Sequence, residues 1–179
     1  ELYFSAYDGI NGDELWMYDG VNAPSMVADI NPNGNSDPSW LTVFNNELYF
    51  SALDATNGAE LWKYDGTNAP SMVADINKNS YSSSPQDLTV FNNDLYFRAD
   101  DGTNGFELWK TDGTTLGTSM VADINPNGDG LFYQNQIFSI KMIVFNDELY
   151  FMGKDSSIMG YELWVTSGSE FSHTEVTYS

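Results

Sequence analysis

The sequence predicts an all-β fold, a β-propeller of four four-stranded units or an arc of a larger propeller. The first observation is a Glu-Leu-Trp segment that recurs at residues 14–16, 60–62, 107–109 and 162–164. Repeats about 47 residues long are typical of propellers and other repeat architectures. The second observation is that the expected strands carry apolar or aromatic residues on both faces, so each sheet must pack between two neighbours.

The second unit shows its four expected strands most clearly. The first covers residues 41–44 and the second covers 47–52, with Asn45-Asn46 between them as a two-residue hairpin turn. Asparagine tolerates positive φ, which the primed hairpin turns require. The third strand starts at Glu60 and ends at the turn Asp65-Gly66, and the fourth covers 71–76. Four sequential antiparallel strands of this kind form one propeller blade.

The repeat divides the chain into one repeat domain of four units. Their approximate ranges are 1–36, 37–83, 84–130 and 131–179. The first unit begins at its second strand, so we expect the chain to be a piece of a longer array. In the last unit, residues 174–178 take the place of the fourth strand without the sequence of the earlier copies. Terminal repeats are commonly atypical in this way.

The composition excludes several classes of protein. The chain has 26 acidic and 6 basic residues and a net charge of −20, which repels phosphate backbones and argues against nucleic-acid binding. It has no cysteine, so neither a disulfide nor a thiolate site is available. No apolar run approaches the ~20 residues that a membrane-spanning helix needs.

The repeated motifs resemble those of the ELWxxDGT repeat family. Copies of Glu-Leu-Trp-x-x-Asp-Gly begin at Glu14, Glu60 and Glu107, and Ser-Met-Val-Ala-Asp-Ile follows at 25–30, 71–76 and 119–124. The chain departs from the pattern at Ser167 and at an insertion covering 131–140. The resemblance covers nearly the whole chain and implies a propeller-like array in a secreted or cell-surface bacterial protein.

Oxygen-bearing side chains gather in the loops that we expect on one rim of the propeller. In an antiparallel blade, the loop after the second strand and the loop after the fourth strand emerge on the same side. Clusters of carboxylate and amide oxygens bind hard cations, so these loops predict a calcium site. The alternative is that Asp and Asn only close turns by bonding their own backbone. The candidate ligands are Asp29, Asn31, Asn33, Asp37, Asp75, Asn77, Asp123, Asn125, Asn127 and Asp129.

Three aromatic residues outside the repeated motifs are candidate ligand-binding residues. Trp40 follows Pro38-Ser39 in the loop between the first and second units, and we expect it to be an exposed contact. Phe132 and Tyr133 belong to the 131–140 insertion, which either folds down as a local plug or presents a patch for a partner. The four motif tryptophans are expected to pack between blades.

These features predict a non-enzymatic extracellular or cell-surface module with a structural, adhesion or ligand-binding role. Its expected partner is a protein, a glycan, a second copy or the rest of a longer chain, and calcium is the one cofactor predicted. The first alternative is a lectin-like propeller, and the second is a hydrolase with carboxylates on the acidic rim. His173 is the single histidine, and no nucleophile signature accompanies it, so we predict no catalytic residue.

Overall fold

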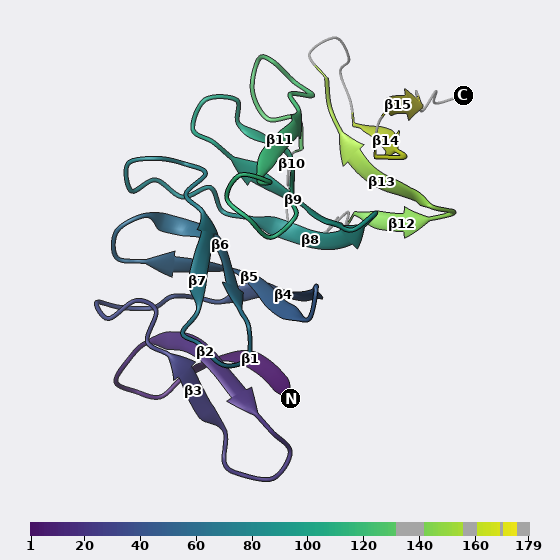
Figure 1. Cartoon of the computed structure of the whole chain (residues 1–179). Coiled ribbons are helices and arrows are strands. Elements are labelled where there is room, and N and C mark those ends of the chain that lie inside the picture. The colour runs from purple at the N-terminus through teal and green to yellow at the C-terminus, as the bar shows by residue number, and fades with distance from the viewer. Residues whose placement is uncertain (132–141, 156–160, 169, 175–179) are drawn as a thin grey trace.

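We analysed a computed structural model of the chain, which describes residues 1–131, 142–155, 161–168 and 170–174 (Figure 1). All regular elements in these ranges are β-strands, and they form four antiparallel sheets. Within the same ranges, no helix is long and apolar enough to cross a membrane. The prediction of an all-β, four-bladed propeller fold is confirmed, with each sheet forming one blade.

The first two blades are meanders, in which strands adjacent in the sequence are also adjacent in the sheet. The first blade has three strands: β1 (Leu2–Tyr7), β2 (Asp13–Tyr18) and β3 (Ser25–Ala28). The second blade has four: β4 (Ser39–Phe44), β5 (Glu47–Asp54), β6 (Gly58–Tyr64) and β7 (Ser71–Ala74).

The last two blades repeat the four-stranded order. The third contains β8 (Gln86–Phe91), β9 (Asp94–Asp100), β10 (Phe106–Thr111) and β11 (Ser119–Ala122). The fourth contains β12 (Ile143–Phe145), β13 (Glu148–Gly153), β14 (Glu162–Thr166) and β15 (Phe171–Thr174). The last strand therefore lies earlier than the predicted segment 174–178.

The hairpins between the first two strands of a blade follow the predicted turn chemistry. Both residues of each turn have positive φ, namely 50° and 62° at Asn45-Asn46, and 48° and 63° at Asn92-Asn93. The third hairpin uses Asn146-Asp147 with φ of 52° and 59°. Two successive left-handed residues define the primed turn whose twist matches that of the flanking strands.

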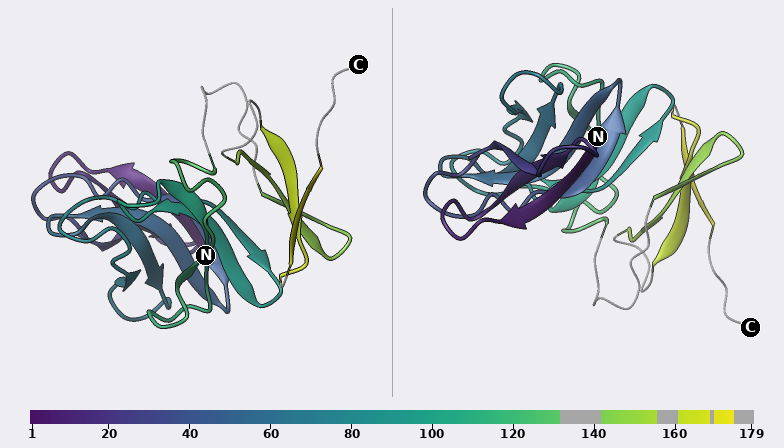
Figure 2. Two further views of the ribbon diagram at one scale, coloured as in Figure 1. Left: turned by 90° about the horizontal axis from the view of Figure 1, so that it is seen from above. Right: turned by 90° about the horizontal axis from the view of Figure 1, so that it is seen from below.

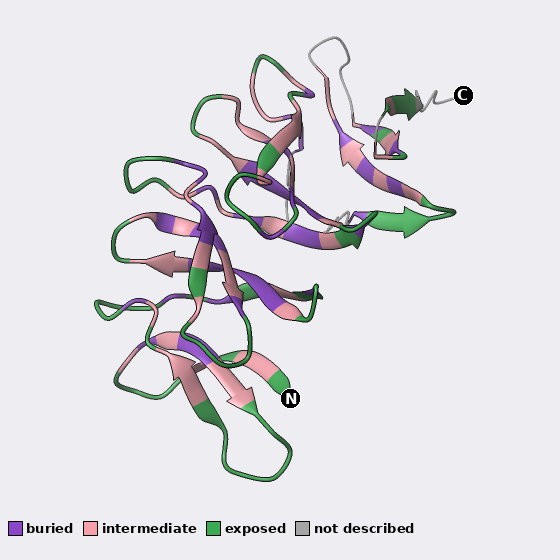
Figure 3. Ribbon diagram, viewed as in Figure 1, coloured by how far each residue is buried: buried purple, intermediate pink, exposed green. Residues whose placement is uncertain are grey.

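The blades stand side by side along a curved row, from the first at the N-terminus to the fourth at the C-terminus (Figures 1 and 2). Their first strands lie on the inner side of the row, where the Thr42 hydroxyl of β4 is 3.3 Å from the Leu88 carbonyl oxygen of β8. The buried residues concentrate between neighbouring sheets (Figure 3).

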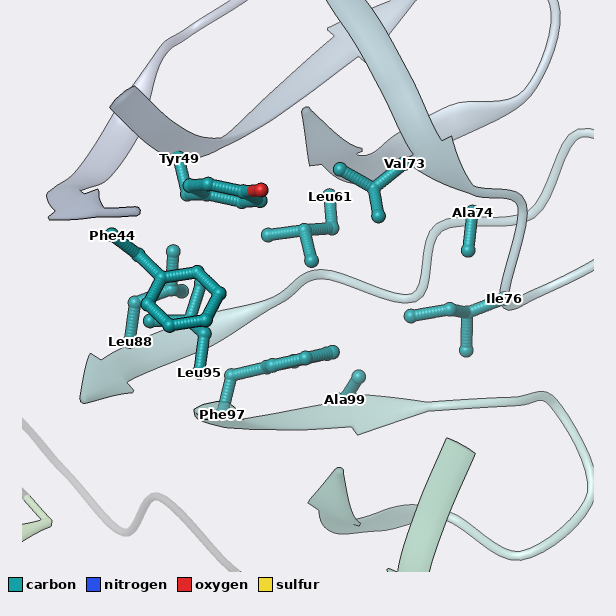
Figure 4. Packing of buried hydrophobic residues seen from close by; sticks show 10 residues of the cluster. All are labelled: Phe44, Tyr49, Leu61, Val73, Ala74, Ile76, Leu88, Leu95, Phe97 and Ala99. Carbon is teal, nitrogen blue, oxygen red and sulfur yellow. The ribbon is translucent and has the colours of Figure 1, made fainter. Parts of the chain in front are cut away.

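The interface between the second and third blades illustrates this packing (Figure 4). Leu61 and Val73 of the second blade face Leu95 and Phe97 of the third, and all four are buried. Burying both faces of a sheet removes a large apolar area from water, which is the main force holding adjacent blades together.

A glycine where β1 leads into β2, β5 into β6 and β9 into β10 lets two loops approach closely. Gly12, Gly58 and Gly105 have φ between +77° and +86°. A Cβ atom on Gly58 would lie 2.6 Å from the Tyr81 carbonyl oxygen in the loop that leads to the next blade. Only glycine supplies both the left-handed backbone and the missing side chain.

We expect Gly58→Ala to destabilise the protein more than Gly66→Ala. Gly66 has a similar φ of +85°, but a Cβ atom there would meet nothing within 4 Å. Gly66→Ala therefore costs about 1 kcal/mol for the left-handed backbone alone, whereas Gly58→Ala adds a clash with backbone. Urea unfolding of both variants measures the difference. Equal losses would show that the close approach of the two loops is unimportant.

Candidate functional site

The rim predicted to be rich in oxygen is formed as expected, because the two sets of loops pack against each other. The Ser36 N–H donates to the Asp13 carbonyl oxygen (3.0 Å), and the Asp13 N–H donates to Oδ1 of Asn35 (3.1 Å). The corresponding contact in the next unit joins the Ala59 N–H to the Ser82 hydroxyl (2.9 Å). Each blade therefore brings its own third strand against the loop that crosses to the following blade.

The aspartates at the start of the β1–β2, β5–β6 and β9–β10 connections are used within the turn. Oδ1 of Asp8 accepts from the Ile10 and Asn11 N–H groups (both 2.8 Å), and Oδ2 accepts from the Asn11 side-chain amide (2.6 Å). Asp54 with Asn57 and Asp101 with Asn104 repeat this Asp-x-x-Asn turn. These bonds favour the charged carboxylate and lower the pKa of Asp8.

The same Asp-x-x-Asn turn also closes loops on the opposite rim, and the sequence analysis did not predict this second use of the turn. Oδ1 of Asp19 accepts from the Val21 and Asn22 N–H groups (both 2.8 Å), and Asp65 does the same with Thr67 and Asn68. The side-chain hydrogen bond from Asn22, followed by the backbone bonds, lowers the pKa of Asp19 to about 2. The signal was present in the sequence as Asp-x-x-Asn after both the second and the third strands.

The candidate calcium ligands divide into two groups in the structure. The Asn31, Asn77 and Asn125 side chains point into their own loops, where each amide donates to a carbonyl oxygen: Asn35 (2.7 Å), Ser82 (3.1 Å) and Asp129 (3.0 Å), respectively. The others lie at or near the surface: Asp29, Asn33, Asp37, Asp75, Asp123, Asn127 and Asp129.

Two of the surface carboxylates also have partners within the protein. Oδ1 of Asp129 accepts from the Phe106 N–H (2.9 Å), and Oδ2 of Asp75 lies 3.7 Å from Nζ of Lys78. Among the described residues, no group of three or more His, Asp or Glu side chains converges as a metal site would require. Calcium binding at this rim stays a prediction of the sequence.

The glutamate of the repeated motif is buried and binds the crossing loop. Glu14, Glu60 and Glu107 are 0% exposed. In the second blade, Oε2 of Glu60 accepts from the Ile76 N–H (2.9 Å) and the Ser83 hydroxyl (2.6 Å), and Oε1 accepts from the Ser83 N–H (2.9 Å). A buried carboxylate is tolerated only when its oxygens are satisfied in this way.

The residue held by the glutamate also reaches the next blade. The Ser83 carbonyl oxygen accepts from the Asp100 N–H of β9 (2.9 Å), and Ser36 does the same with the Leu53 N–H of β5 (2.8 Å). In the third unit, the Gly130 N–H binds Glu107 (2.7 Å), and its carbonyl oxygen accepts from the Lys154 N–H (2.8 Å). The motif glutamate therefore fixes the position of one blade relative to the next.

In the fourth blade, the motif glutamate has a histidine beside it. Nδ1 of His173 lies 2.6 Å from Oε2 of Glu162, and the imidazole ring packs 4.8 Å from the Trp164 ring centroid. The histidine side chain is 36% exposed. His173 is therefore a partner of the motif glutamate rather than an isolated surface residue.

A second feature of the rim is a bulge at the start of the inner strands. Trp40 and Asp87 have φ of 59° and 58°, and the pairing register with the next strand shifts at both positions. Asp37 and Ser84, three residues earlier, are also left-handed, with φ of 46° and 48°. Non-glycine residues in this region cost of order 1–3 kcal/mol each and often mark functional sites.

Trp40 does not lie in a loop, as the sequence had suggested, but within β4. It is half-buried and packs against the core between the second and third blades. The bulge explains the difference. It adds an unpaired residue to the strand and so interrupts the alternation of side chains by which a strand is recognised in a sequence. Its counterpart Asp87 could have been found by aligning the units on their Asn-Asn hairpins, which places Trp40 and Asp87 at equivalent positions.

Trp40 lines two cavities, which together we call the Trp40 cleft. The first, of about 250 Å³, lies where β4 and β8 begin, and its lining includes Asp37, Ser39, Ser84 and Gln86. The second, of about 280 Å³, runs along the inner strands between Thr42, Asp87 and Thr89. The other two aromatic candidates, Phe132 and Tyr133, lie outside the described residues.

Comparison with known proteins gives one result on fold. No protein-family model and no curated protein match the chain. A solved structure similar to it is an α-L-arabinofuranosidase from Clostridium thermocellum, with 14% sequence identity and a TM-score of 0.33. The match covers 77% of this chain and 71% of the arabinofuranosidase chain.

The prediction of a non-enzymatic structural or adhesion module is withdrawn, since the solved structure found by the comparison is that of an enzyme. At 14% identity and a TM-score of 0.33, this likeness assigns no activity to the present chain.

We expect Glu60→Gln to lower the free energy of unfolding by about 2–4 kcal/mol, because one amide oxygen cannot accept all the bonds that Glu60 receives and buried donors are left unpaired. Glu47→Gln is the matched control, since Glu47 is half-buried and forms a surface pair with Lys63 (3.2 Å). That change costs under about 1 kcal/mol. Similar losses in denaturant unfolding for both variants would contradict the proposed role of the motif glutamate.

We expect stability to fall as the pH rises from about 4.5 to about 7. Burial raises the pKa of Glu107 from 4.5 to about 7, and it also raises the pKa of Glu60. At a pH between the unfolded and folded pKa values, the buried glutamates hold protons more tightly in the folded state than in the unfolded state. Losing these protons as the pH rises therefore lowers the stability of the fold. Below pH 3.8, stability should instead fall as the pH falls. The folded state lowers the pKa of Asp19 and its equivalents, so protonation of these carboxylates removes the stability that their hydrogen bonds contribute.

Thermal unfolding across this pH range tests the prediction. The melting temperature should be highest at about pH 4–5 and lower near neutrality. Because repulsion within a chain of net charge −20 also grows with pH, Glu107→Gln provides the control. This variant should show a shallower decline, and an unchanged slope would show that the buried glutamate does not contribute.

Proposed function

We propose that this protein binds a neutral carbohydrate in the Trp40 cleft. The observation that carries the proposal is the combination of one aromatic face with several small polar groups in a cavity of about 250 Å³. The apolar C–H face of a sugar ring packs against an indole, as large aromatic side chains offer apolar area beside a polar group. Ser39, Ser84 and Gln86 supply hydroxyl and amide groups that can both donate to and accept from sugar hydroxyls.

Charge and shape restrict the class of ligand. Asp37 lines the cleft, and the chain as a whole carries a net charge of −20, so an anionic ligand is disfavoured. The second cavity, along the inner strands, also has Trp40 in its lining. Two cavities that share one aromatic residue favour an oligosaccharide over a single compact sugar.

Two carboxylates are close enough to the cleft to contact a bound sugar. Asp37 lines the first cavity and Asp87 lines the second. Pairs of carboxylates also perform glycoside hydrolysis, so a binding assay should be combined with detection of cleavage products. An extracellular location would bring such a cleft into contact with glycans, and this location stays a prediction from the sequence.

We expect Trp40→Ala to weaken binding of neutral oligosaccharides by at least about tenfold, which corresponds to 1.4 kcal/mol of lost contact. Trp40→Phe should retain part of the affinity, because it keeps an aromatic face. A neutral glycan array followed by titration calorimetry on the selected sugars measures both effects. The same incubations, analysed for reducing ends, report any hydrolysis.

Tyr7→Ala is the control, because Tyr7 is an aromatic residue that is 65% exposed and does not line the cleft. It should leave affinity unchanged. Absence of binding to every neutral glycan, or equal loss in the Tyr7 and Trp40 variants, would show that the cleft is not a carbohydrate site. If cleavage occurs, Asp37→Asn and Asp87→Asn identify which carboxylate it requires.

A further inference from the structure

The first cavity of the Trp40 cleft has part of its lining on the sheet of the second blade, where Ser51 of β5 and Ala59 of β6 border it. Ser51 pairs with Leu61, and Ala59 lies two residues before Leu61 on the same strand. Side chains at paired positions, and at every second position of a strand, lie on one face of a sheet. Leu61 on this face packs against the third blade (Figure 4). Ser51 and Ala59 therefore face the third blade, whose first residues, 84–86, also line the cavity.

Two buried serines line this cavity, and they differ in whether their hydroxyl groups are already used. Ser36 is 0% exposed, and its hydroxyl donates to Oε2 of Glu14 (2.6 Å). Ser51 is 6% exposed, and within the described part of the chain its hydroxyl forms no hydrogen bond with the protein. Burying a hydroxyl without a partner costs free energy. The Ser51 hydroxyl is therefore available to a molecule that enters the cavity.

The same two positions carry much larger side chains in the third blade. Arg98 and Phe106 stand there in place of Ser51 and Ala59, as the pairing of β9 with β10 and of β5 with β6 shows. Cζ of Arg98 lies 4.1 Å from the centroid of the Phe106 ring, and Arg98 is 5% exposed. A guanidinium held over an aromatic face at this distance is a stabilising contact. The pair covers the part of the sheet that borders the cavity in the second blade.

The backbone of the two junctions is alike, so the difference lies in these side chains. Between the second and third blades, the Asp100 N–H donates to the Ser83 carbonyl oxygen (2.9 Å). Between the third and fourth, the Lys154 N–H donates to the Gly130 carbonyl oxygen (2.8 Å). One backbone arrangement thus accommodates a large stacked pair at one junction and two small residues beside a cavity at the other.

We propose that Ser51 and Ala59 are the specificity-determining residues of the carbohydrate site. The Ser51 hydroxyl binds a hydroxyl group of the sugar, and the small Ala59 side chain leaves room for the sugar ring between the blades. This inference rests on the function proposed above and deepens it, because it names the buried group that recognises the ligand. A serine hydroxyl can donate to or accept from a sugar hydroxyl. A site built around such a bond discriminates against an analogue that lacks the hydroxyl.

The absence of cysteine from the sequence allows a direct test, because Ser51→Cys introduces a single thiol. Methyl methanethiosulfonate, a small neutral reagent, should modify this thiol in the free protein. The neutral oligosaccharide selected on the glycan array, at about ten times its Kd for the variant, leaves about a tenth of the protein free. It should therefore slow the modification about tenfold. Mass spectrometry of timed samples measures the rate.

Ser5→Cys is the matched control for this experiment. Ser5 pairs with Leu15 as Ser51 pairs with Leu61, but it is exposed and does not line the cleft. The sugar should leave its rate of modification unchanged. Equal protection of both thiols would show that the sugar does not bind at Ser51.

Affinity measurements on two further variants separate the roles of size and hydrogen bonding. Ser51→Ala keeps the space but removes the hydroxyl, so binding should weaken about two- to tenfold. It should also abolish the difference in affinity between the sugar and one of its monodeoxy analogues. Ser51→Arg combined with Ala59→Phe introduces the pair that the third blade already holds, and should weaken binding by more than about tenfold. Urea unfolding confirms that each variant is folded.

The outcomes distinguish this inference from the function on which it rests. The inference alone is overturned if the parent chain binds a neutral glycan that Trp40→Ala releases, while the filled variant keeps full affinity and the thiol at position 51 is unprotected. A thiol at this position that does not react in the free folded protein would also overturn it. A parent chain that binds no neutral glycan would remove the proposed function, and this inference with it.

Discussion

The arrangement of the blades depends on a buried carboxylate in the repeated Glu-Leu-Trp motif. Glu14, Glu60 and Glu107 lie on β2, β6 and β10, and they accept hydrogen bonds from the loops that follow β3, β7 and β11. The residue bound by this carboxylate pairs in turn with the second strand of the following blade. Apolar packing between sheets is not directional, so it allows neighbouring blades to slide or tilt. The glutamate adds directional bonds at one point of each junction and thereby fixes the geometry that the apolar faces leave open.

The acidic character of the chain has a related physical origin. Many of its aspartates accept hydrogen bonds from backbone N–H groups two and three residues later, as Asp8, Asp19 and Asp65 do. These carboxylates replace backbone partners that a short loop cannot provide. Their pKa values are lowered, so they remain charged and keep the surface negative over a wide pH range. The net charge of −20 is thus partly a consequence of turn construction, and it limits the ligands that the surface can accept.

The Trp40 cleft lies at a position where the second and third units have the same backbone conformation but different side chains. The bulges at Trp40 and Asp87 have nearly the same φ, so the two blades bend their inner strands in the same way. One position carries an indole and the other a carboxylate, and both line the same cavity along the inner strands. The ring packs against the core, which holds it in place in the lining of both cavities. Two units with the same backbone at this position thus give one cavity an asymmetric lining, because their side chains differ.

The sequence by itself determined the strand order, the hairpin turns and the rim on which the loops meet. These features depend on local rules: alternation along strands, the tolerance of asparagine for positive φ, and the alternating direction of strands in a meander. It could not determine which oxygens were available to a ligand, because the oxygens of Glu60 accept hydrogen bonds from Ile76 and Ser83, which are distant in the sequence. Nor could it place Trp40 in a strand, since a bulge removes the alternation by which strands are recognised. The tertiary structure decided these points because the packing of one blade against the next determines which polar groups are already bonded and which aromatic residues line a cavity.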